Sequence, residues 1–471
     1  MKFSSPFAAA TLLSVAALAQ ATSQFSIESD EAIRKTSSLL AWDMLQYYRG
    51  NLSGHTPGIL PGPPPAGDYY WWQAGAMWGA LIDYWHWTGD STYNDLVMQS
   101  MQFQVGEGKN YMPINVTASL GNDDQAFWGM AALRAAEYGF PNPPPDRPSW
   151  LGLAQTVFET QASPDRHDKT CGGGLRWQIP FANNGYDYKN SIANGCLFNM
   201  GARLARYTGN KTYADWAVRT WDWMEEVGFL NKKYGIYDGA NVTTNCTAYN
   251  KAEFSYNNAV FAEGAAFMYN FAESCGRSSI AKADSIPLLR QTGLELWKSR
   301  TERLVDYGLG RFLPDGIAIE SACENTGCKT DMYTYKGFFH RWYATITQIA
   351  PFLGPKILPP LKTSAQAAIK QCTGGALGRQ CGFKWLTGVY DGNTGHGQEM
   401  SVLGAVSALL IEKATPPMTI HTGGTSKEDT RKPGAWSSES RRATVADKVG
   451  AGFLTVILMA VVCGMLGWIS I

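Results

Sequence analysis

Hydrophobic positions recur with a helical period along almost the whole of residues 23–414, and strand-like alternation is scarce. The best short exception is GIYDGANVTT, residues 235–244. Matching the apolar positions to the helical template predicts about twelve helices, with several boundaries set by Gly, Pro or Asn. These helices are expected to begin near Asp30, Trp72, Thr92, Asp123, Trp150, Ser191, Lys211, Tyr256, Ser285, Tyr335, Lys362 and Gln398.

Charge is distributed unevenly among these helices. Stretches such as DDQAFWGMAALRAA and SIANGCLFNMGARLA are rich in Ala and Gly and nearly free of charge after the first turn. Helices of this kind are apolar around most of their circumference and should be buried. Their partners, such as YADWAVRTWDWMEEV, keep a charged face. The alternation predicts an inner ring of helices inside an outer ring, which is an all-α (α/α)6 barrel.

Two similar segments of the sequence support this arrangement. TGDSTYNDL (88–96) resembles TGNKTYADW (208–216), and another helix pair lies between the two. Each helical hairpin therefore takes about 60 residues, and six hairpins would occupy about 360. An open α-solenoid fits the period almost as well, but it does not explain why most inner helices begin with polar or aromatic residues.

The two ends of the chain look like targeting signals. Lys2 precedes an apolar stretch that closes with Ala17-Leu18-Ala19, so residues 1–19 are expected to be a secretory signal peptide. The alternative is a short buried helix. Residues 23–414 then form the (α/α)6 domain, and residues 415–448 form a stalk rich in Ser, Thr, Gly and Pro.

The C-terminal segment 449–471 is long and apolar enough to span a bilayer. It follows a polar spacer and a group of small residues around Ser438, which is the pattern of a glycosylphosphatidylinositol (GPI) attachment signal. We expect Ser438 to carry the anchor, the tail to be removed, and the protein to lie at the outer face of the plasma membrane or in a cell wall. A retained membrane helix is the alternative.

Cysteines and glycosylation sequons fit a secreted protein. Eight of the nine cysteines lie between the two signals, which suggests disulfides, with Cys323–Cys328 and Cys372–Cys381 as plausible local pairs. The sequons begin at Asn51, Asn115, Asn210, Asn241 and Asn245.

Composition narrows the class of ligand. The chain has 40 Lys+Arg, 40 Asp+Glu and 17 Trp, and 13% of its residues are aromatic. Zero net charge without a basic stripe argues against nucleic acid. A composition rich in Trp, Tyr, Gly and Asn suits carbohydrate, because aromatic faces stack on the C–H surfaces of sugars and amides bond to their hydroxyl groups. No motif points to a metal or an organic cofactor.

The sharpest local feature is GNDDQ, residues 121–125, at the start of a nearly uncharged helix. An Asp pair at such a place can simply cap the helix. A retaining glycosidase, however, needs two carboxyl groups close together, one as nucleophile and one as acid/base. Adjacent aspartates supply both roles, because the charge of one raises the pKa of the other.

GNDDQAFWGMAALRAAE, with DYYWWQAGAMWGALIDYW before it and FSYNNAVFAEGAA after it, resembles glycoside hydrolase family 76 from Trp42 to about Leu410. The resemblance implies an (α/α)6 barrel and retaining cleavage of α-1,6-linked mannose, with Asp123 as nucleophile and Asp124 as acid/base. Fungal members are described as GPI-anchored mannan endo-1,6-α-mannosidases of the cell wall. For that branch it further implies a transglycosylase that cleaves the mannose core of a GPI glycan and passes the wall protein to a β-1,6-glucan acceptor. The competing hypothesis is a catalytically silent carbohydrate-binding or structural protein.

Further residues are expected to bind the sugar because they stand near inner-helix starts or in aromatic motifs. For each Trp or Tyr the alternative is an ordinary core position, for each Asn it is a helix cap, and for His340 it is a structural histidine. The candidates are Asp68, Trp72, Gln73, Asn122, Trp128, Trp177, Asn194, Tyr256, Asn257, Lys336, His340 and Arg341.

Overall fold

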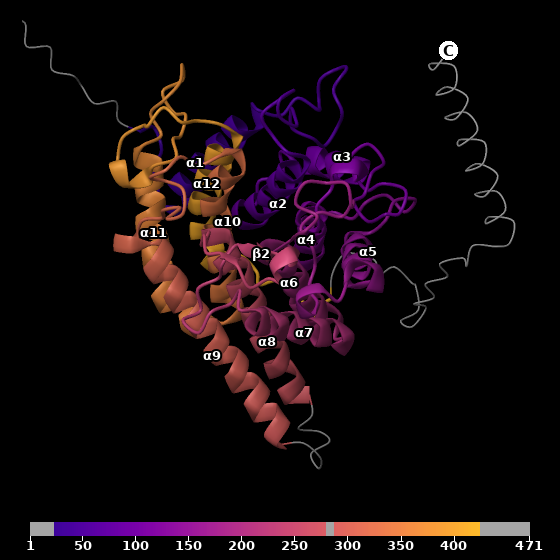
Figure 1. Ribbon diagram of the computed structural model, residues 1–471. Coiled ribbons are helices and arrows are strands. Elements are labelled where there is room, and N and C mark those ends of the chain that lie inside the picture. Colours follow the sequence, from indigo (N-terminus) through magenta and orange to yellow (C-terminus); the bar gives the residue numbers. More distant parts are fainter. Residues whose placement is uncertain (1–22, 279–286, 424–471) are drawn as a thin grey trace, which may run out of the picture. The chain divides into compact units, whose positions relative to one another are not determined.

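The computed structural model describes residues 23–278 and 287–423, and it describes side chains over the same ranges except 275–278 and 287–292. Twelve α-helices and a small three-stranded sheet lie in this part of the chain (Figure 1). The helices are α1 (Asp30–Leu45), α2 (Trp71–Thr88), α3 (Asn94–Phe103), α4 (Asn122–Tyr138), α5 (Trp150–Ala162), α6 (Ser191–Thr208), α7 (Lys211–Val227), α8 (Ser255–Ser278), α9 (Pro287–Phe312), α10 (Tyr335–Ile349), α11 (Gly354–Lys370) and α12 (His396–Ser407).

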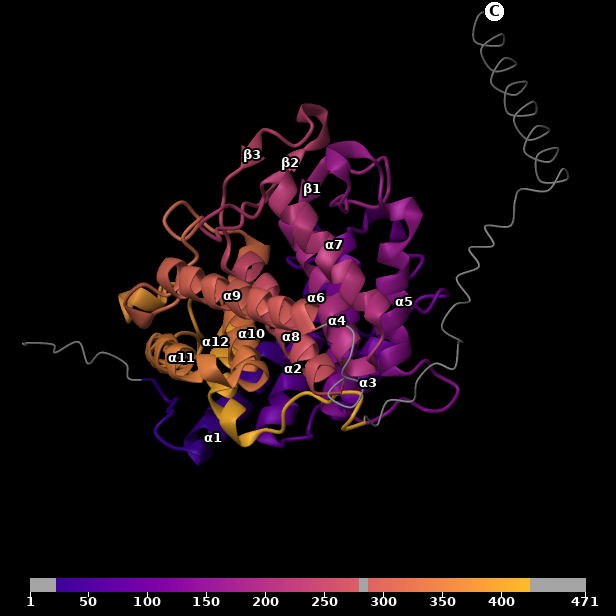
Figure 2. The same ribbon diagram turned by 90° about the horizontal axis from the view of Figure 1, so that it is seen from below.

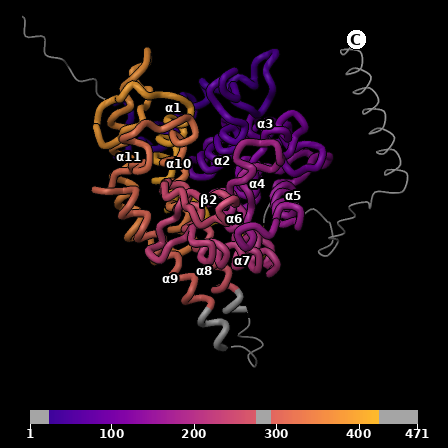
Figure 3. The backbone as a smooth tube through the Cα atoms, in the orientation of Figure 1, coloured from indigo at the N-terminus to yellow at the C-terminus, as the bar shows by residue number. Residues whose placement is uncertain are grey.

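The even-numbered helices form a closed ring. Helix α2 packs on α4, α4 on α6, α6 on α8, α8 on α10, α10 on α12, and α12 returns to α2. The odd-numbered helices lie outside this ring, as the view along the barrel shows (Figure 2). The first and last helices, α1 and α12, pack on each other (Figure 1), and the indigo and orange ends of the described backbone thereby come together (Figure 3). This closure confirms the (α/α)6 barrel and excludes the open solenoid.

The inner ring is held together by close packing and by buried ion pairs. Gly75 of α2 lies so near the Trp128 ring of α4 that a Cβ atom there would come within 2.7 Å of the indole. Deeper in the barrel, ion pairs join five of the inner helices. They are Arg134–Glu263 (2.5 Å), Arg134–Asp83 (3.5 Å), Arg203–Glu137 (2.7 Å) and Arg341–Asp83 (2.6 Å). Removing one partner of such a pair leaves a buried charge and costs about 3–5 kcal/mol.

The largest error in the helix boundaries concerns α11. This helix begins at Gly354 rather than near Lys362, and it contains Pro359 and Pro360. The start was predicted after these two prolines, because a proline inside a helix removes a backbone hydrogen-bond donor. The face of α11 formed by residues such as Ile357 and Leu361 is buried against the barrel, and this packing offsets that loss.

The strand-like segment 235–244 contributes β2 (Gly239–Asn241), which pairs antiparallel with β1 (Tyr188–Asn190) and β3 (Tyr249–Asn250). The structure contains the two predicted local disulfides, Cys323–Cys328 and Cys372–Cys381, and a third, long-range disulfide, Cys171–Cys246. Cys196 is a buried free thiol. The Cys275 side chain lies outside the described part.

Several predicted features of the chain ends lie outside the described residues, namely the signal peptide 1–19, the anchor residue Ser438 and the tail 449–471. Within the ranges that are described, no helix has the length and apolar character needed to cross a membrane. The sequons at Asn51, Asn115, Asn241 and Asn245 are exposed, and Asn210 is half-buried.

Candidate active site

Asp123 and Asp124, here called the carboxylate pair, lie in the first turn of α4. The helix is capped by Gly121, whose backbone N–H donates to Asp124 Oδ2 at 2.7 Å. Helix α4 therefore begins one residue ahead of the pair, and both aspartates are helical. Asp124 also serves the cap, so the capping interpretation and the chemical interpretation both apply to this residue.

Asp123 is held by two donors. Asn190 Nδ2 donates to Asp123 Oδ2 at 2.9 Å, and the Asp124 backbone N–H donates to Asp123 Oδ1 at 2.9 Å. Asn190 is the last residue of β1 and caps α6, where its Oδ1 accepts from the Ala193 backbone N–H at 3.3 Å. Donors of this kind favour the ionised form of a carboxyl group. Sequence reasoning named Asn194 instead of Asn190, although a cap position ahead of an inner helix was the available signal.

The electrostatics distinguish the two members of the pair. Burial raises the pKa of Asp124 to about 7, with a further contribution from the charge of Asp331. Burial and the charge of Asp124 raise the pKa of Asp123 well above its usual value, while the Asn190 hydrogen bond lowers it. Once Asp124 carries a proton, its charge no longer opposes ionisation of Asp123. With both pKa values raised, the pair keeps a proton near neutral pH, and the Asn190 hydrogen bond is the contact that favours Asp123 as the ionised member.

A third carboxyl group, Asp331, was not anticipated. It lies in the 3-10 turn Thr330–Thr334 just before α10, where Trp72 Nε1 donates to its Oδ1 at 3.3 Å. Burial raises the pKa of Asp331 to about 6. Trp72 in turn packs on Phe127, one turn into α4, with ring centroids 4.6 Å apart. Nothing in the sequence around Asp331 links it to GNDDQ, because the two segments meet only when the barrel closes.

Aromatic rings surround the carboxylate pair. Tyr256 at the start of α8 and Tyr335 at the start of α10 stack with centroids 3.7 Å apart, and the charge of Asp123 acts on Tyr256. Trp177 is 38% exposed, and its carbonyl accepts from the Asn122 backbone N–H at 2.8 Å. The structure thus brings Trp72, Trp177 and Tyr256 of the predicted set to the end of the barrel where the carboxylate pair lies, here called the mouth.

The predicted amides anchor the loops that form this mouth. Asn122 Nδ2 donates to the Arg176 carbonyl at 2.9 Å, and Asn194 Oδ1 accepts from the Leu175 backbone N–H at 2.8 Å. Gln73 Oε1 accepts from the Tyr70 backbone N–H at 2.8 Å and caps α2. These contacts are structural, and they shape the site.

Other predicted sugar-binding residues make contacts elsewhere. Lys336 forms a buried ion pair with Glu324 at 2.8 Å, and His340 is bonded to the Lys336 carbonyl and the Ser364 hydroxyl. Arg341 pairs with Asp83 inside the barrel. Lys336 and His340 make these contacts in the first two turns of α10, and Arg341 also lines the small cavity between the inner helices. Trp128 and Asn257 are fully buried, whereas Asp68 is exposed ahead of α2.

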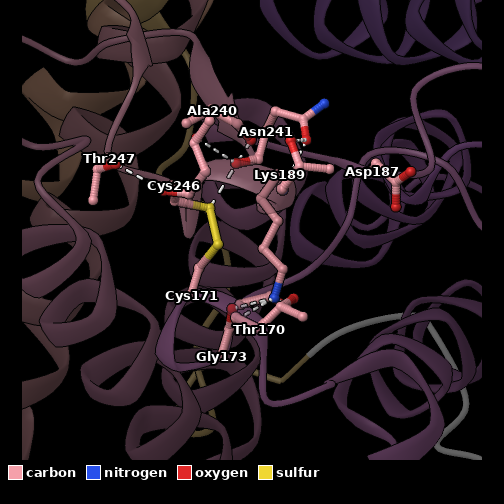
Figure 4. The surroundings of a disulfide bond; sticks show 12 residues. Thr170, Cys171, Gly173, Asp187, Lys189, Ala240, Asn241, Cys246 and Thr247 are labelled. Carbon is pink, nitrogen blue, oxygen red and sulfur yellow. Dashed lines mark hydrogen bonds between the residues drawn. A yellow bond between two sulfur atoms is a disulfide. The ribbon is translucent and has the colours of Figure 1, made fainter.

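Strand β1, which carries Asn190, is held in place by the contacts of Lys189 and by a disulfide. Lys189, which is fully buried, donates through Nζ to Asp168 Oδ1 at 3.0 Å and to the carbonyls of Thr170, Gly173 and Gly174 at 2.8, 2.5 and 3.1 Å. The Cys171–Cys246 disulfide ties the same loop to the segment after β2 (Figure 4). A fixed β1 in turn fixes the amide that bonds Asp123.

Among the described side chains, no three of the His, Cys, Asp and Glu type gather where they could hold a metal ion.

A barrel of this topology with two adjacent carboxyl groups at an aromatic mouth is typical of a glycosidase. Comparison with known proteins shows the family. The sequence profile described as glycosyl hydrolase family 76 matches residues 32–421, and the chain belongs to this family. It is 39% identical to mannan endo-1,6-alpha-mannosidase DCW1 of Saccharomyces cerevisiae, covering 92% of both chains. It is 38% identical to the DFG5 enzyme of Candida albicans, covering 94% of each.

Solved structures agree. Dfg5 from Chaetomium thermophilum, crystallised in complex with glucosamine, is 51% identical, with a TM-score of 0.80 and coverage of 86% of this chain and 97% of that one. The α-1,6-mannanase GH76A of Salegentibacter, in complex with α-1,6-mannotriose, is only 15% identical, with a TM-score of 0.61 over 80% of this chain and 99% of that one. The second likeness shows the fold alone.

Proposed function

We propose that the protein is a retaining, endo-acting α-1,6-mannosidase or transglycosylase, with Asp123 as nucleophile and Asp124 as acid/base. The carboxylate pair in the first turn of α4 carries this proposal, because it places two carboxyl groups side by side and the Asn190 hydrogen bond favours the ionised form of Asp123. The names of relatives that match over nine-tenths of their length support α-1,6-linked mannose as the substrate.

The chemistry follows from the protonation states. Asp123 attacks the anomeric carbon while Asp124 gives its proton to the departing glycosidic oxygen, which leaves a mannosyl ester on Asp123. Asp124, now ionised, removes a proton from the incoming hydroxyl as that oxygen displaces Asp123. Water as the acceptor completes hydrolysis, and a sugar hydroxyl completes transfer. Two displacements at one carbon retain its configuration.

We further propose a role in cell-wall assembly. In this role the enzyme cleaves within the mannose core of a GPI glycan and passes the attached wall protein to a β-1,6-glucan acceptor. The protein itself would follow the secretory route and be anchored through Ser438. A relative with 51% identity that binds glucosamine, which is a hexosamine with a free amine, is compatible with a donor that contains such a sugar.

Product analysis tests the proposal. The purified protein is incubated with linear α-1,6-mannan and, separately, with a GPI-glycan donor plus labelled β-1,6-glucan. The Asp123→Asn variant serves as the control in each reaction. Internal cleavage of mannan that the variant lacks supports the hydrolase, and labelled coupled product supports transfer. Mannan binding without cleavage by the wild-type protein would instead indicate a silent carbohydrate-binding protein.

A further inference from the structure

An uncharged loop lies beside the carboxylate pair and exposes aromatic side chains. This aromatic loop is WQIPFANNGY, residues 177–186. Its central residue, Phe181, is 83% exposed, and no other Phe, Tyr or Trp in the described part of the chain is as exposed. Most of the Phe181 ring therefore faces water and is accessible to a ligand.

The aromatic loop is joined directly to the turn that carries the pair. Trp177 accepts through its carbonyl from the Asn122 backbone N–H at 2.8 Å, and the Ile179 backbone N–H donates to the Leu120 carbonyl at 3.0 Å. These two bonds lie on either side of Gly121, the cap of α4. A ligand bound at the Trp177 end of the loop would therefore lie next to the turn that carries the carboxylate pair.

The loop also has a fixed shape. Asn183 Nδ2 donates to Gln178 Oε1 at 2.9 Å across the turn, and the Asn183 backbone N–H donates to the Pro180 carbonyl at 3.1 Å. At its end, Arg176 donates to the Tyr186 carbonyl at 2.8 Å and places its guanidinium 4.4 Å from the centre of the Tyr186 ring. The rings of Phe181 and Tyr186 meet edge to face at 5.3 Å. A preorganised surface binds without a large ordering cost.

The chemistry of the loop indicates the kind of ligand. It has three aromatic rings, side-chain amides such as that of the exposed Asn184, and no charged residue. Flat apolar faces suit the C–H faces of pyranose rings, and amides suit their hydroxyl groups. The adjoining Arg176 is already paired with Asp168 and Asp187, so the loop favours a neutral ligand. We propose that the aromatic loop is a distal binding subsite for a neutral α-1,6-mannan chain, with Phe181 as the ring on which a remote mannose stacks. This inference rests on the proposed function.

A distal subsite makes a length-dependent contribution. A substrate with a single mannose occupies only the mouth and does not reach Phe181, whereas an oligosaccharide of several mannoses extends along the loop. Loss of the Phe181 ring should therefore raise KM for long substrates and leave turnover of a monosaccharide donor unchanged.

The test compares Phe181→Ala with wild type on α-mannosyl fluoride and on α-1,6-mannohexaose. We expect KM for the hexaose to rise about fivefold, the order expected for one lost aromatic contact, with no change on the fluoride. The matched control is Phe352→Ala, because Phe352 is 40% exposed but lies after the end of α10, at the opposite end of the barrel. This control should leave both substrates unaffected. An unchanged KM for the hexaose, or an equal loss on both substrates, would overturn the subsite.

A second measurement separates this inference from the proposed function. If the wild-type protein cleaves no α-1,6-mannan and forms no coupled product from the GPI-glycan donor, the proposed function fails, and electrophoresis in gels containing mannan or β-1,6-glucan then decides the subsite. Retardation by mannan that Phe181→Ala weakens supports the subsite. Equal retardation of the two proteins, or a Phe181-dependent retardation by β-1,6-glucan alone, overturns it.

Discussion

The hydrogen bond from Asn190 to Asp123 makes a quantitative prediction. Asn190→Ser removes the donor 2.9 Å from Asp123 Oδ2 but leaves a hydroxyl that can still cap α6. A hydrogen bond to a charged group contributes about 1.5–3 kcal/mol. At 1.36 kcal/mol per pKa unit, its loss should raise the pKa of Asp123 by about one to two units.

The effect should therefore depend on pH. The ionised carboxylate is the nucleophile, so the acidic limb of the kcat/KM profile moves to higher pH by the same one to two units. On that limb the variant is about 10- to 100-fold slower, and the deficit shrinks as pH rises. The folding free energy should change little, because Ser and Asn cap helices equally well.

The assay is initial-rate kinetics with an α-mannosyl fluoride between pH 3 and 8. Fluoride departs without a proton, so the profile reports the nucleophile and is free of the limb due to Asp124. A profile that superimposes on the wild type would refute the reasoning. A loss of equal size at every pH would also refute it, since that result would mean that Asn190 only orients the side chain.

The remaining predictions concern Asp124, the Lys189 contacts that hold β1, and the Cys171–Cys246 disulfide. Asp124→Asn should slow cleavage of mannan far more than turnover of a mannosyl fluoride. It should also raise Tm at pH 8, because a pKa raised to about 7 means that native stability falls as pH rises from about 4 through 7; an unchanged Tm would contradict this. Lys189→Met leaves three carbonyls without their ammonium partner, while Asp168 keeps its ion pair with Arg176, so chemical denaturation should show a loss of about 1–3 kcal/mol together with reduced activity. Replacing Cys171 and Cys246 by Ser opens a loop with a sequence separation of 75 residues and should cost about 4 kcal/mol in the same assay; a loss below about 1 kcal/mol would mean that the disulfide is dispensable.

Much of the fold could be predicted because the alternation of uncharged and amphipathic helices is a local property of the sequence. The starts of α4, α5, α6 and α7 were predicted to within a residue. The start of α11 was missed because burial of one of its faces outweighed the effect of its prolines.

The site could be predicted only where its residues are neighbours in sequence. GNDDQ places two carboxyl groups together by itself. Asn190 and Asp331, by contrast, reach this region through strand pairing and barrel closure, over separations that no local pattern encodes. The same holds for Lys336, His340 and Arg341, because the polar motif on α10 gives no sign that their partners are Glu324, Ser364 and Asp83.

The most direct test of the account is identification of the residue that becomes mannosylated. The protein is treated with an activated α-mannosyl fluoride under conditions that trap the intermediate, digested, and analysed by mass spectrometry. The account predicts one mannosyl adduct within residues 121–125, located on Asp123 and absent from Asp123→Asn. An adduct on Asp124 or outside this segment, or inversion of the anomeric centre in the released product, would contradict it.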